Sequence, residues 1–266
     1  MPPLFEELDY RRTALGELIL RRRRILKLDR DVVEVILNDE HLMSDMFTAS
    51  EIALARLPLD RMIAADAGLD AGLDAGLDAG LDAGLDGGRG TAARPHILVG
   101  GLGLGYTAAT VLDYDAVASL TVIEYLAPLI EWHEAGILPL ERRLAEDPRC
   151  RFVEGDFFAL ARGGDGFDPQ MPGRRFDGIF LDIDHSPKFH LNPSHADFYS
   201  PEGLARLQRS LAPGGIFALW SNDPPDDDFL AGMRSVFANA SAEEVVFHNP
   251  LLEEDCTQTV YLGMAG

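Results

Sequence analysis

The chain has 266 residues, of which 47% are hydrophobic, so it can bury the core of one large α/β domain with a small N-terminal extension. Its formal net charge of −21 at pH 7 repels phosphates, which disfavours a nucleic acid partner. The charge is compatible with a cationic ligand, although an acidic surface also serves solubility alone. No apolar run approaches the roughly 18 residues of a membrane helix, and the N-terminus has no apolar segment typical of a secretory signal. We therefore expect a cytoplasmic protein without a membrane partner.

Residues 1–46 are expected to form a small N-terminal β-meander. Short apolar stretches alternate here with turn residues, and we expect strands at 25–29, 32–37 and 41–44. A run of four arginines, Arg21 to Arg24, stands out in an acidic chain. We interpret this run as a solvated strand edge or as a set of ion pairs with acidic neighbours.

Residues 47–66 carry apolar side chains at helical spacing, which predicts a connecting helix that Pro58 breaks or restarts. The tetrapeptide AGLD then occurs five times in succession, from Ala67 to Asp86. Because each glycine costs about 1 kcal/mol in a helix relative to alanine, we interpret 67–94 as a low-complexity linker. A calcium site is disfavoured, since the segment has no dense ligand loop closed by a glutamate.

The two cysteines, Cys150 and Cys256, do not suggest a disulfide framework. Neither lies in a CxxC pair, so a zinc site is also disfavoured and no metal is expected. We expect two buried free thiols in a reducing compartment.

From residue 95 onward, strand-like and helix-like segments alternate. Five apolar strands are each followed by a helical stretch, and two last strands have no helix between them. This order is typical of a doubly wound α/β fold with a mainly parallel seven-stranded sheet and one antiparallel strand. The expected strands are 96–100, 119–124, 150–155, 176–184, 215–221, 243–248 and 257–263. The expected helices are 105–113, 126–135, 157–161, 201–211 and 226–238.

Four glycines occupy the turn between the first of these strands and its helix. Gly100, Gly101, Gly103 and Gly105 allow a sharp turn and let a ligand approach where a Cβ would otherwise stand. In a doubly wound sheet, ligands bind beside the carboxyl ends of the strands. A nucleotide-like ligand therefore fits this turn, although one glycine in a tight turn also has a purely steric explanation.

Acidic side chains follow the next three strands. Glu124 ends the second strand, 19 residues after the last of the four glycines, where a carboxylate can bind a pair of ribose hydroxyls. Asp156 follows the third strand and can accept a hydrogen bond from a base amino group or cap the next helix. The fourth strand ends in Asp182, Asp184 and His185. We expect the chemistry to take place at this fourth strand.

These residues resemble the class I S-adenosylmethionine-dependent methyltransferase fold and, within it, the spermidine synthase-like group of polyamine aminopropyltransferases. The resemblance covers nearly the whole chain. It is carried by the segments ILVGGLGLG (97–105), DPRCRFVEGDFFAL (147–160) and DFYSPEGLARLQRSLAPGGIFALW (197–220). It implies a nucleoside-binding Rossmann-like catalytic domain over 95–266. Val99 stands where most methyltransferases carry an acid, and spermidine synthases also lack that acid.

The resemblance also implies the roles of the site residues. Asp182 would take a proton from an attacking amine, Asp184, His185 and Tyr199 would orient it, and Glu51 would hold a distal amine. The alternative is that Asp184 and His185 are hydrogen-bond partners within a loop and that Tyr199 belongs to the core. S-adenosylmethionine or its decarboxylated form would be the co-substrate, bound by Gly100, Gly101, Gly103, Gly105, Glu124 and Asp156. The usual family pattern is Asp-x-x-Asp-Pro, whereas here the second acid is displaced by one position and a histidine stands in its place. The acceptor amine, the reaction and the oligomeric state, with a homodimer as one possibility, therefore stay open.

Three functions remain in competition at this stage. The first is an aminopropyltransferase that uses decarboxylated S-adenosylmethionine. The second is a methyltransferase with a small-molecule acceptor, and the third is a catalytically silent protein that keeps the nucleoside pocket. NAD binding also uses a glycine-rich turn and a distant acid, but the Pro-Gly-Gly strand and the antiparallel last hairpin argue against it.

Overall fold

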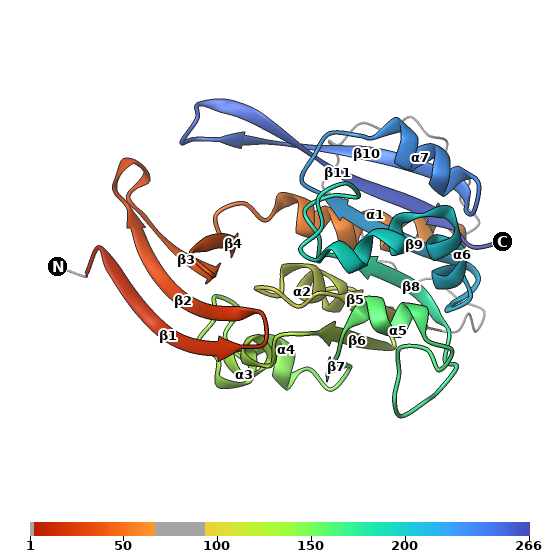
Figure 1. Cartoon of the computed structure of the whole chain (residues 1–266), viewed down its shortest axis with the longest axis horizontal. Helices are drawn as coiled ribbons and strands as arrows, with labels where there is room; N and C mark the ends of the chain where they lie inside the picture. Colours follow the sequence, from red (N-terminus) through yellow and green to blue (C-terminus); the bar gives the residue numbers. More distant parts are fainter. Residues whose placement is uncertain (1–2, 67–93) are drawn as a thin grey trace.

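The computed structural model describes residues 3–66 and 94–266, which form a small antiparallel sheet beside a larger mixed sheet (Figure 1). The small sheet has the order β1-β2-β3-β4, with β1 (Phe5–Thr13), β2 (Gly16–Ile25), β3 (Arg30–Leu37) and β4 (Glu40–Ser44). The large sheet has the order β10-β11-β9-β8-β5-β6-β7. Its strands are β5 (His96–Gly100), β6 (Ser119–Glu124), β7 (Cys150–Glu154), β8 (Phe176–Leu181), β9 (Leu211–Ser221), β10 (Ala238–Asn249) and β11 (Glu254–Met264).

The large sheet confirms the predicted doubly wound topology. Strands β5 to β9 pair in parallel, and β11 runs antiparallel to both β9 and β10. The helices are α1 (Ala49–Asp66), α2 (Tyr106–Leu112), α3 (Ala127–Ala135), α4 (Arg143–Glu146), α5 (Phe157–Arg162), α6 (Pro201–Gln208) and α7 (Asp227–Arg234). The described residues also form two short 3-10 helices, η1 (Leu26–Leu28) and η2 (Pro193–Tyr199).

Alternating side chains of the central strands build a separate core on each face of the large sheet. Ile97 and Val99 of β5 pack in one cluster with residues of α1 and α2, whereas Leu98 points into the cluster formed with α5, α6 and α7. This two-sided burial explains why the parallel strands are nearly continuous apolar runs. It also holds the carboxyl ends of β5, β6 and β8 at one edge of the sheet.

The N-terminal sheet differs from the sequence prediction in three places. Residues 5–13 form β1 and residues 16–25 form β2, and neither range was among the expected strands. The strand expected at 25–29 is replaced by η1, where Leu26 is exposed and Asp29 adopts a left-handed conformation with φ 50°. A third core cluster joins this sheet to the region after the glycine turn, through Leu18, Leu20 and Val35 against Leu104, Leu126, Leu129, Trp132 and Leu138. The small sheet is thereby fixed beside the ends of β5 and β6.

The arginine run lies in β2, which is an inner strand between β1 and β3 and not a sheet edge. Its members form ion pairs, as the alternative interpretation predicted. Arg21 and Arg23 both bind Glu34 of β3, at 2.8 and 2.6 Å, and Glu34 is only 2% exposed. Arg22 binds the exposed Glu6 at 3.0 Å. The arginines therefore stabilise the small sheet and compensate its buried carboxylate.

Helix α1 continues through Pro58, so the predicted break at this residue is wrong. A proline inside a helix loses one backbone hydrogen bond and crowds the preceding turn. Here Leu54, Ala55 and Leu59 are buried against the large sheet, and this packing offsets the cost. The AGLD tract lies outside the described residues, so its interpretation as a linker stays a prediction, as do the domain boundaries.

Both cysteines are free, but each is only half-buried, which differs from the expected full burial. Burial nevertheless raises the pKa of the Cys150 thiol to about 12. A thiol with so high a pKa is a poor nucleophile at neutral pH.

Three of the predicted glycines have the left-handed backbone that the β5–α2 turn requires, with φ of 92° at Gly101, 48° at Gly103 and 90° at Gly105. A Cβ on Gly101 would lie 2.1 Å from the Asp182 carbonyl oxygen, so the turn also needs glycine for its close approach to β8. His133 of α3 supports the turn from below, because its Nε2 lies 3.0 Å from the Gly103 carbonyl oxygen. Its Nδ1 is buried and has no partner among the described residues.

We predict that Glu34→Gln lowers the free energy of unfolding by about 2 kcal/mol, because two arginines lose a buried counter-charge. Glu6→Gln is the matched control on the same sheet, since its exposed ion pair is worth less than about 1 kcal/mol. Urea denaturation measures both. An equal loss in the two variants would contradict the role of the buried carboxylate.

We also predict that His133 weakens the fold as the pH falls. Burial lowers the pKa of His133 from 6.5 to about 4, so the unfolded chain binds the proton first. The free energy of unfolding then loses about 2 kcal/mol between pH 7 and pH 5 from this group alone. In His133→Gln, urea denaturation at the two pH values should show a loss smaller by that amount. An unchanged pH dependence would show that His133 titrates normally.

Candidate active site

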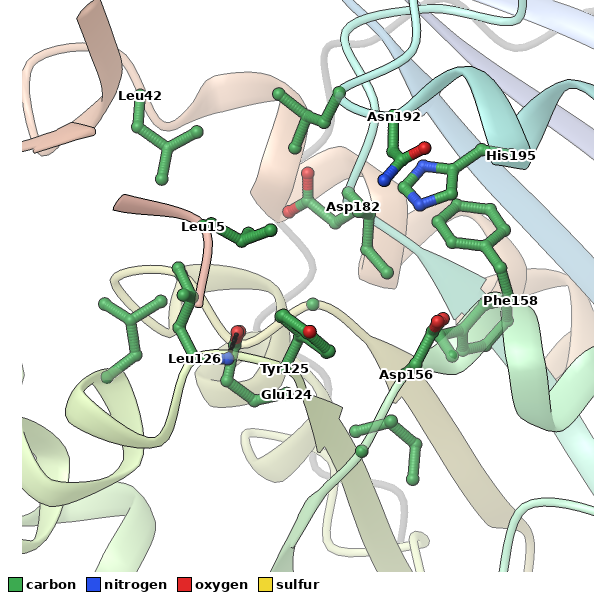
Figure 2. Close-up of a pocket in the computed structure, with 18 of the residues that line it drawn as sticks. Leu15, Leu42, Glu124, Tyr125, Leu126, Asp156, Phe158, Asp182, Asn192 and His195 are labelled. Carbon is green, nitrogen blue, oxygen red and sulfur yellow. Dashed lines mark hydrogen bonds between the residues drawn. The ribbon is translucent and has the colours of Figure 1, made fainter. Parts of the chain in front are cut away.

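A first pocket lies at the carboxyl ends of β5, β6, β7 and β8, where the sequence predicts a nucleoside (Figure 2). Its cavity volume is about 180 Å³. The predicted residues that line it are Gly101, Gly103, Glu124, Asp156 and Asp182. Leu15 and Leu42 of the N-terminal sheet close one side, and Asn192, Ser194 and His195 close another. Gly100 ends β5 and Gly105 precedes α2, and neither lines this pocket.

Glu124 is held in the wall of this pocket by backbone N–H groups. Its Oε2 accepts a hydrogen bond from the Leu102 amide at 2.9 Å, and its Oε1 accepts one from the Leu126 amide at 2.7 Å. Burial raises the pKa of Glu124, although its backbone hydrogen bonds favour the charged form. A carboxylate oxygen can accept more than one hydrogen bond. Glu124 can therefore stabilise the glycine turn and still accept hydrogen bonds from ligand hydroxyls.

Asp156 follows β7 and is the N-cap of α5, as the sequence suggested. Its Oδ1 accepts a hydrogen bond from the Ala159 amide at 3.0 Å. Its Oδ2 receives no hydrogen bond from residues 3–66 and 94–266. Because Asp156 also lines the pocket, this second oxygen can accept a hydrogen bond from a ligand.

A second pocket, with a cavity volume of about 380 Å³, lies beside the first. The two pockets share Leu42, Met43, Gly103, Asp182 and Ile183. The β10–β11 hairpin contributes Gln258 to the second pocket, and this hairpin reaches the small sheet through an ion pair of Lys27 with Glu253 at 2.9 Å. Asp182 therefore stands at the junction of two cavities, one of which can hold a donor and the other an acceptor.

Asp182 and Glu51 form the charged centre of the second pocket. The Asp182 Oδ2 accepts a hydrogen bond from the Thr107 hydroxyl at 3.0 Å. Burial raises the pKa of both carboxyl groups, and the negative charge of Asp182 raises that of Glu51 further. No other acidic side chain and no lysine or arginine lines this pocket within the described parts of the chain. The pair is therefore suited to hold one cation or to share a proton.

The remaining predicted residues separate into two places. His185 lines the second pocket with Asp182 and Glu51. Asp184 and Tyr199 instead lie behind the first pocket, where the Tyr199 hydroxyl donates to the Asp184 carboxylate at 2.9 Å. The catalytic and orienting roles assigned to these residues stay predictions.

Sequence reasoning missed His195, which lines the first pocket and contacts Asp184. It also missed His133, which contacts the glycine turn, and Thr107, which donates a hydrogen bond to Asp182. His133 follows Leu129 and Trp132 on the buried face of α3, so helical spacing could have placed it in the core. Thr107 lies 75 residues from Asp182, and His195 lies 11 residues from Asp184 across a mostly irregular segment, so no periodicity in the sequence could have placed either side chain.

No group of three or more His, Cys, Asp or Glu side chains in the described parts of the chain is arranged to hold a metal ion. Among the described helices, none is long and apolar enough to cross a membrane.

Comparison with known proteins finds likeness in structure and not in sequence. No family model matches the chain, and no curated protein matches it. Among solved structures, a spermidine synthase from Thermotoga maritima superposes with a TM-score of 0.63 and 14% identity, over 98% of this chain and 73% of the other. A probable spermidine synthase from Corynebacterium glutamicum ATCC 13032 gives a TM-score of 0.57 and 16% identity, over 99% and 81% of the two chains.

A third structure is a spermidine synthase in complex with the transition state analogue AdoDATO, with a TM-score of 0.61 and 15% identity over 98% of this chain and 72% of the other. At such identities the likeness establishes the fold, including the N-terminal sheet that the alignments cover. The chain therefore has the same fold as these spermidine synthases over nearly its whole length.

Proposed function

We propose that this protein transfers an alkyl group from a sulfonium nucleoside to an amine, with aminopropyl transfer from decarboxylated S-adenosylmethionine as the first candidate. The observation that carries the proposal is the position of Asp182, which lines both the first and the second pocket. A group at that junction can contact a donor and an acceptor at once. The likeness to a spermidine synthase that binds AdoDATO supports the same assignment.

The first pocket suits the nucleoside half of the donor. Glu124 would accept hydrogen bonds from the two ribose hydroxyls, and the positive φ glycines let the backbone come close to the chain that bears the sulfur. Asp156 would accept a hydrogen bond from the base. Tyr125 and Ile183 offer apolar surface to a planar ring. The lining of the first pocket thus fits a nucleoside with a cationic sulfur, since its described residues include no lysine or arginine that would repel the positive charge.

The second pocket suits the amine. A protonated amine would be bound by Asp182 and Glu51, and one of them would accept its proton so that the nitrogen can attack. The new C–N bond forms as the C–S bond breaks, and the sulfur leaves with the electron pair as a neutral thioether. Asp182 is the closer candidate for the proton, because it also lines the donor pocket. Thr107 holds its carboxylate in place.

Methyl transfer from intact S-adenosylmethionine is the second candidate. The specific observation in its favour is that the two carboxylates of the second pocket lie together, and the rest of its described lining carries no further acid. Among the described lining residues, no carboxylate beyond this pair is therefore left for a second ammonium group. Incubation with each sulfonium donor and a panel of amines, followed by mass spectrometry, distinguishes an added aminopropyl group from an added methyl group.

We predict that Asp182→Asn lowers kcat for transfer by about 10²–10⁴-fold, because the amine loses its proton acceptor. The dissociation constant of the nucleoside product should change by less than about threefold. Because burial raises the pKa of Asp182, the wild-type rate should rise with pH over a range above the usual carboxylate pKa of about 4. A variant that keeps wild-type kcat would exclude Asp182 as the proton acceptor.

We predict that Glu124→Gln weakens binding of the thioether nucleoside by at least about tenfold, since an amide replaces one of the two acceptor oxygens. Glu154→Gln is the matched control, because Glu154 pairs with Glu124 at the tip of the neighbouring strand β7 but is exposed and does not line the pocket. Isothermal titration calorimetry measures both. Equal affinities in the two variants would argue against a nucleoside at Glu124.

A further inference from the structure

His195 is held in one orientation by a buried carboxylate. Its Nδ1 lies 3.0 Å from each oxygen of Asp184, which is only 1% exposed. Asp184 also accepts hydrogen bonds from the Tyr199 hydroxyl at 2.9 Å and from the Leu191 amide at 2.7 Å. The His195 ring stacks on Phe158 with 3.8 Å between ring centroids and 21° between planes. The ring is therefore fixed in position and in rotation before any ligand binds.

This arrangement also fixes the chemical character of the ring. The Leu191 amide and the Tyr199 hydroxyl both donate to Asp184, so its carboxylate serves as an acceptor and assigns the imidazole N–H to Nδ1. In the neutral ring Nε2 then carries the lone pair, and it is the one nitrogen of His195 left for a ligand in the first pocket. His195 consequently presents a hydrogen-bond acceptor to that pocket.

A second acceptor lies at the same end of the pocket. Asp156 has one oxygen that receives no hydrogen bond from the described residues, as noted above. Asp156 lies two residues before Phe158, and the Phe158 ring stacks on the His195 ring. Figure 2 shows the Asp156 carboxylate and the His195 ring on either side of the cavity in front of Phe158. Two acceptors that face one space match a group with two hydrogens.

We propose that His195 is a specificity residue for the nucleobase, and that together with Asp156 it selects a 6-aminopurine over a 6-oxopurine. The inference rests on the proposed function, which puts the base of the donor at Asp156. An exocyclic amine has one hydrogen for each acceptor. A 6-oxo group would instead set a carbonyl oxygen against two acceptors, which leaves buried polar atoms unpaired. Asp184 and Tyr199 act through His195 as positioning residues.

The first experiment uses the wild-type protein and the thioether product nucleosides, so it needs no turnover. Isothermal titration calorimetry compares 5′-methylthioadenosine, the thioether that aminopropyl transfer releases, with its counterparts that carry 6-methylamino, 6-hydrogen and 6-oxo groups. We expect affinity to fall in that order, with at least a tenfold difference between the 6-amino and 6-oxo compounds. Equal affinity for the 6-amino and 6-oxo compounds would overturn the inference.

The second experiment uses His195→Phe, which keeps the stacking on Phe158 and removes the acceptor nitrogen. We expect the ratio of 6-amino to 6-oxo affinity to fall by about tenfold, because one of the two acceptors is lost. His190→Phe is the matched control from the same loop: the His190 ring stacks on Tyr199 but does not line the first pocket. It should keep the wild-type ratio. A wild-type ratio in a folded His195→Phe would overturn the inference.

These outcomes separate the two proposals. Selectivity for the 6-amino compound that depends on His195, without transfer to any amine, would support the role of His195 and overturn alkyl transfer. Transfer to an amine with no selectivity among the four nucleosides would support alkyl transfer and overturn the role of His195. Failure of all four nucleosides to bind would overturn both. The wild-type ligand series keeps the test decisive even if His195→Phe does not fold.

Discussion

The close approach of the glycine turn to the end of β8 is the constraint on which the candidate site depends. A Cβ on Gly101 would stand 2.1 Å from the Asp182 carbonyl oxygen, so the turn reaches this position only without a side chain. The turn is then fixed from the other side by the Glu124 carboxylate, which binds the Leu102 amide, and from below by His133. These contacts hold the carboxyl ends of β5, β6 and β8 close together. They therefore form the pocket and place Glu124 at the end of β6 and Asp182 directly after β8.

The two cavities differ in their electrostatics. The chain has a formal charge of −21, yet Glu51 and Asp182 are the only carboxylates among the described residues that line the second pocket, and both are desolvated. Two such acids favour a bound cation, because one positive charge relieves both their desolvation and their mutual repulsion. The first pocket instead combines apolar surface with hydrogen-bond acceptors, as a neutral nucleoside requires. Under the proposed function, transfer between the pockets would occur beside Asp182.

The segment after β8 differs from the Asp-x-x-Asp-Pro pattern of the family that the sequence resembles, and the difference has a structural use. The acid displaced to position 184 turns away from the second pocket and becomes a buried acceptor for His195, Tyr199 and a backbone amide. His185, which stands in the usual place of that acid, lines the second pocket. The altered motif thus links the acceptor side of the site to the wall of the donor pocket.

The sequence by itself determined the doubly wound sheet, the glycine turn and the acids at the strand tips, because strand and helix periodicity and turn chemistry are local properties. Local pattern failed where packing decides: α1 continues through Pro58 because its apolar face is buried on the sheet, and β2 is an inner strand because β1 pairs with it. Only the tertiary structure brought Glu51, Thr107 and His195 to the strand tips. Thr107 bonds to Asp182 across 75 residues, and His195 lies 11 residues from Asp184 across a mostly irregular segment, so these hydrogen bonds leave no periodicity in the sequence.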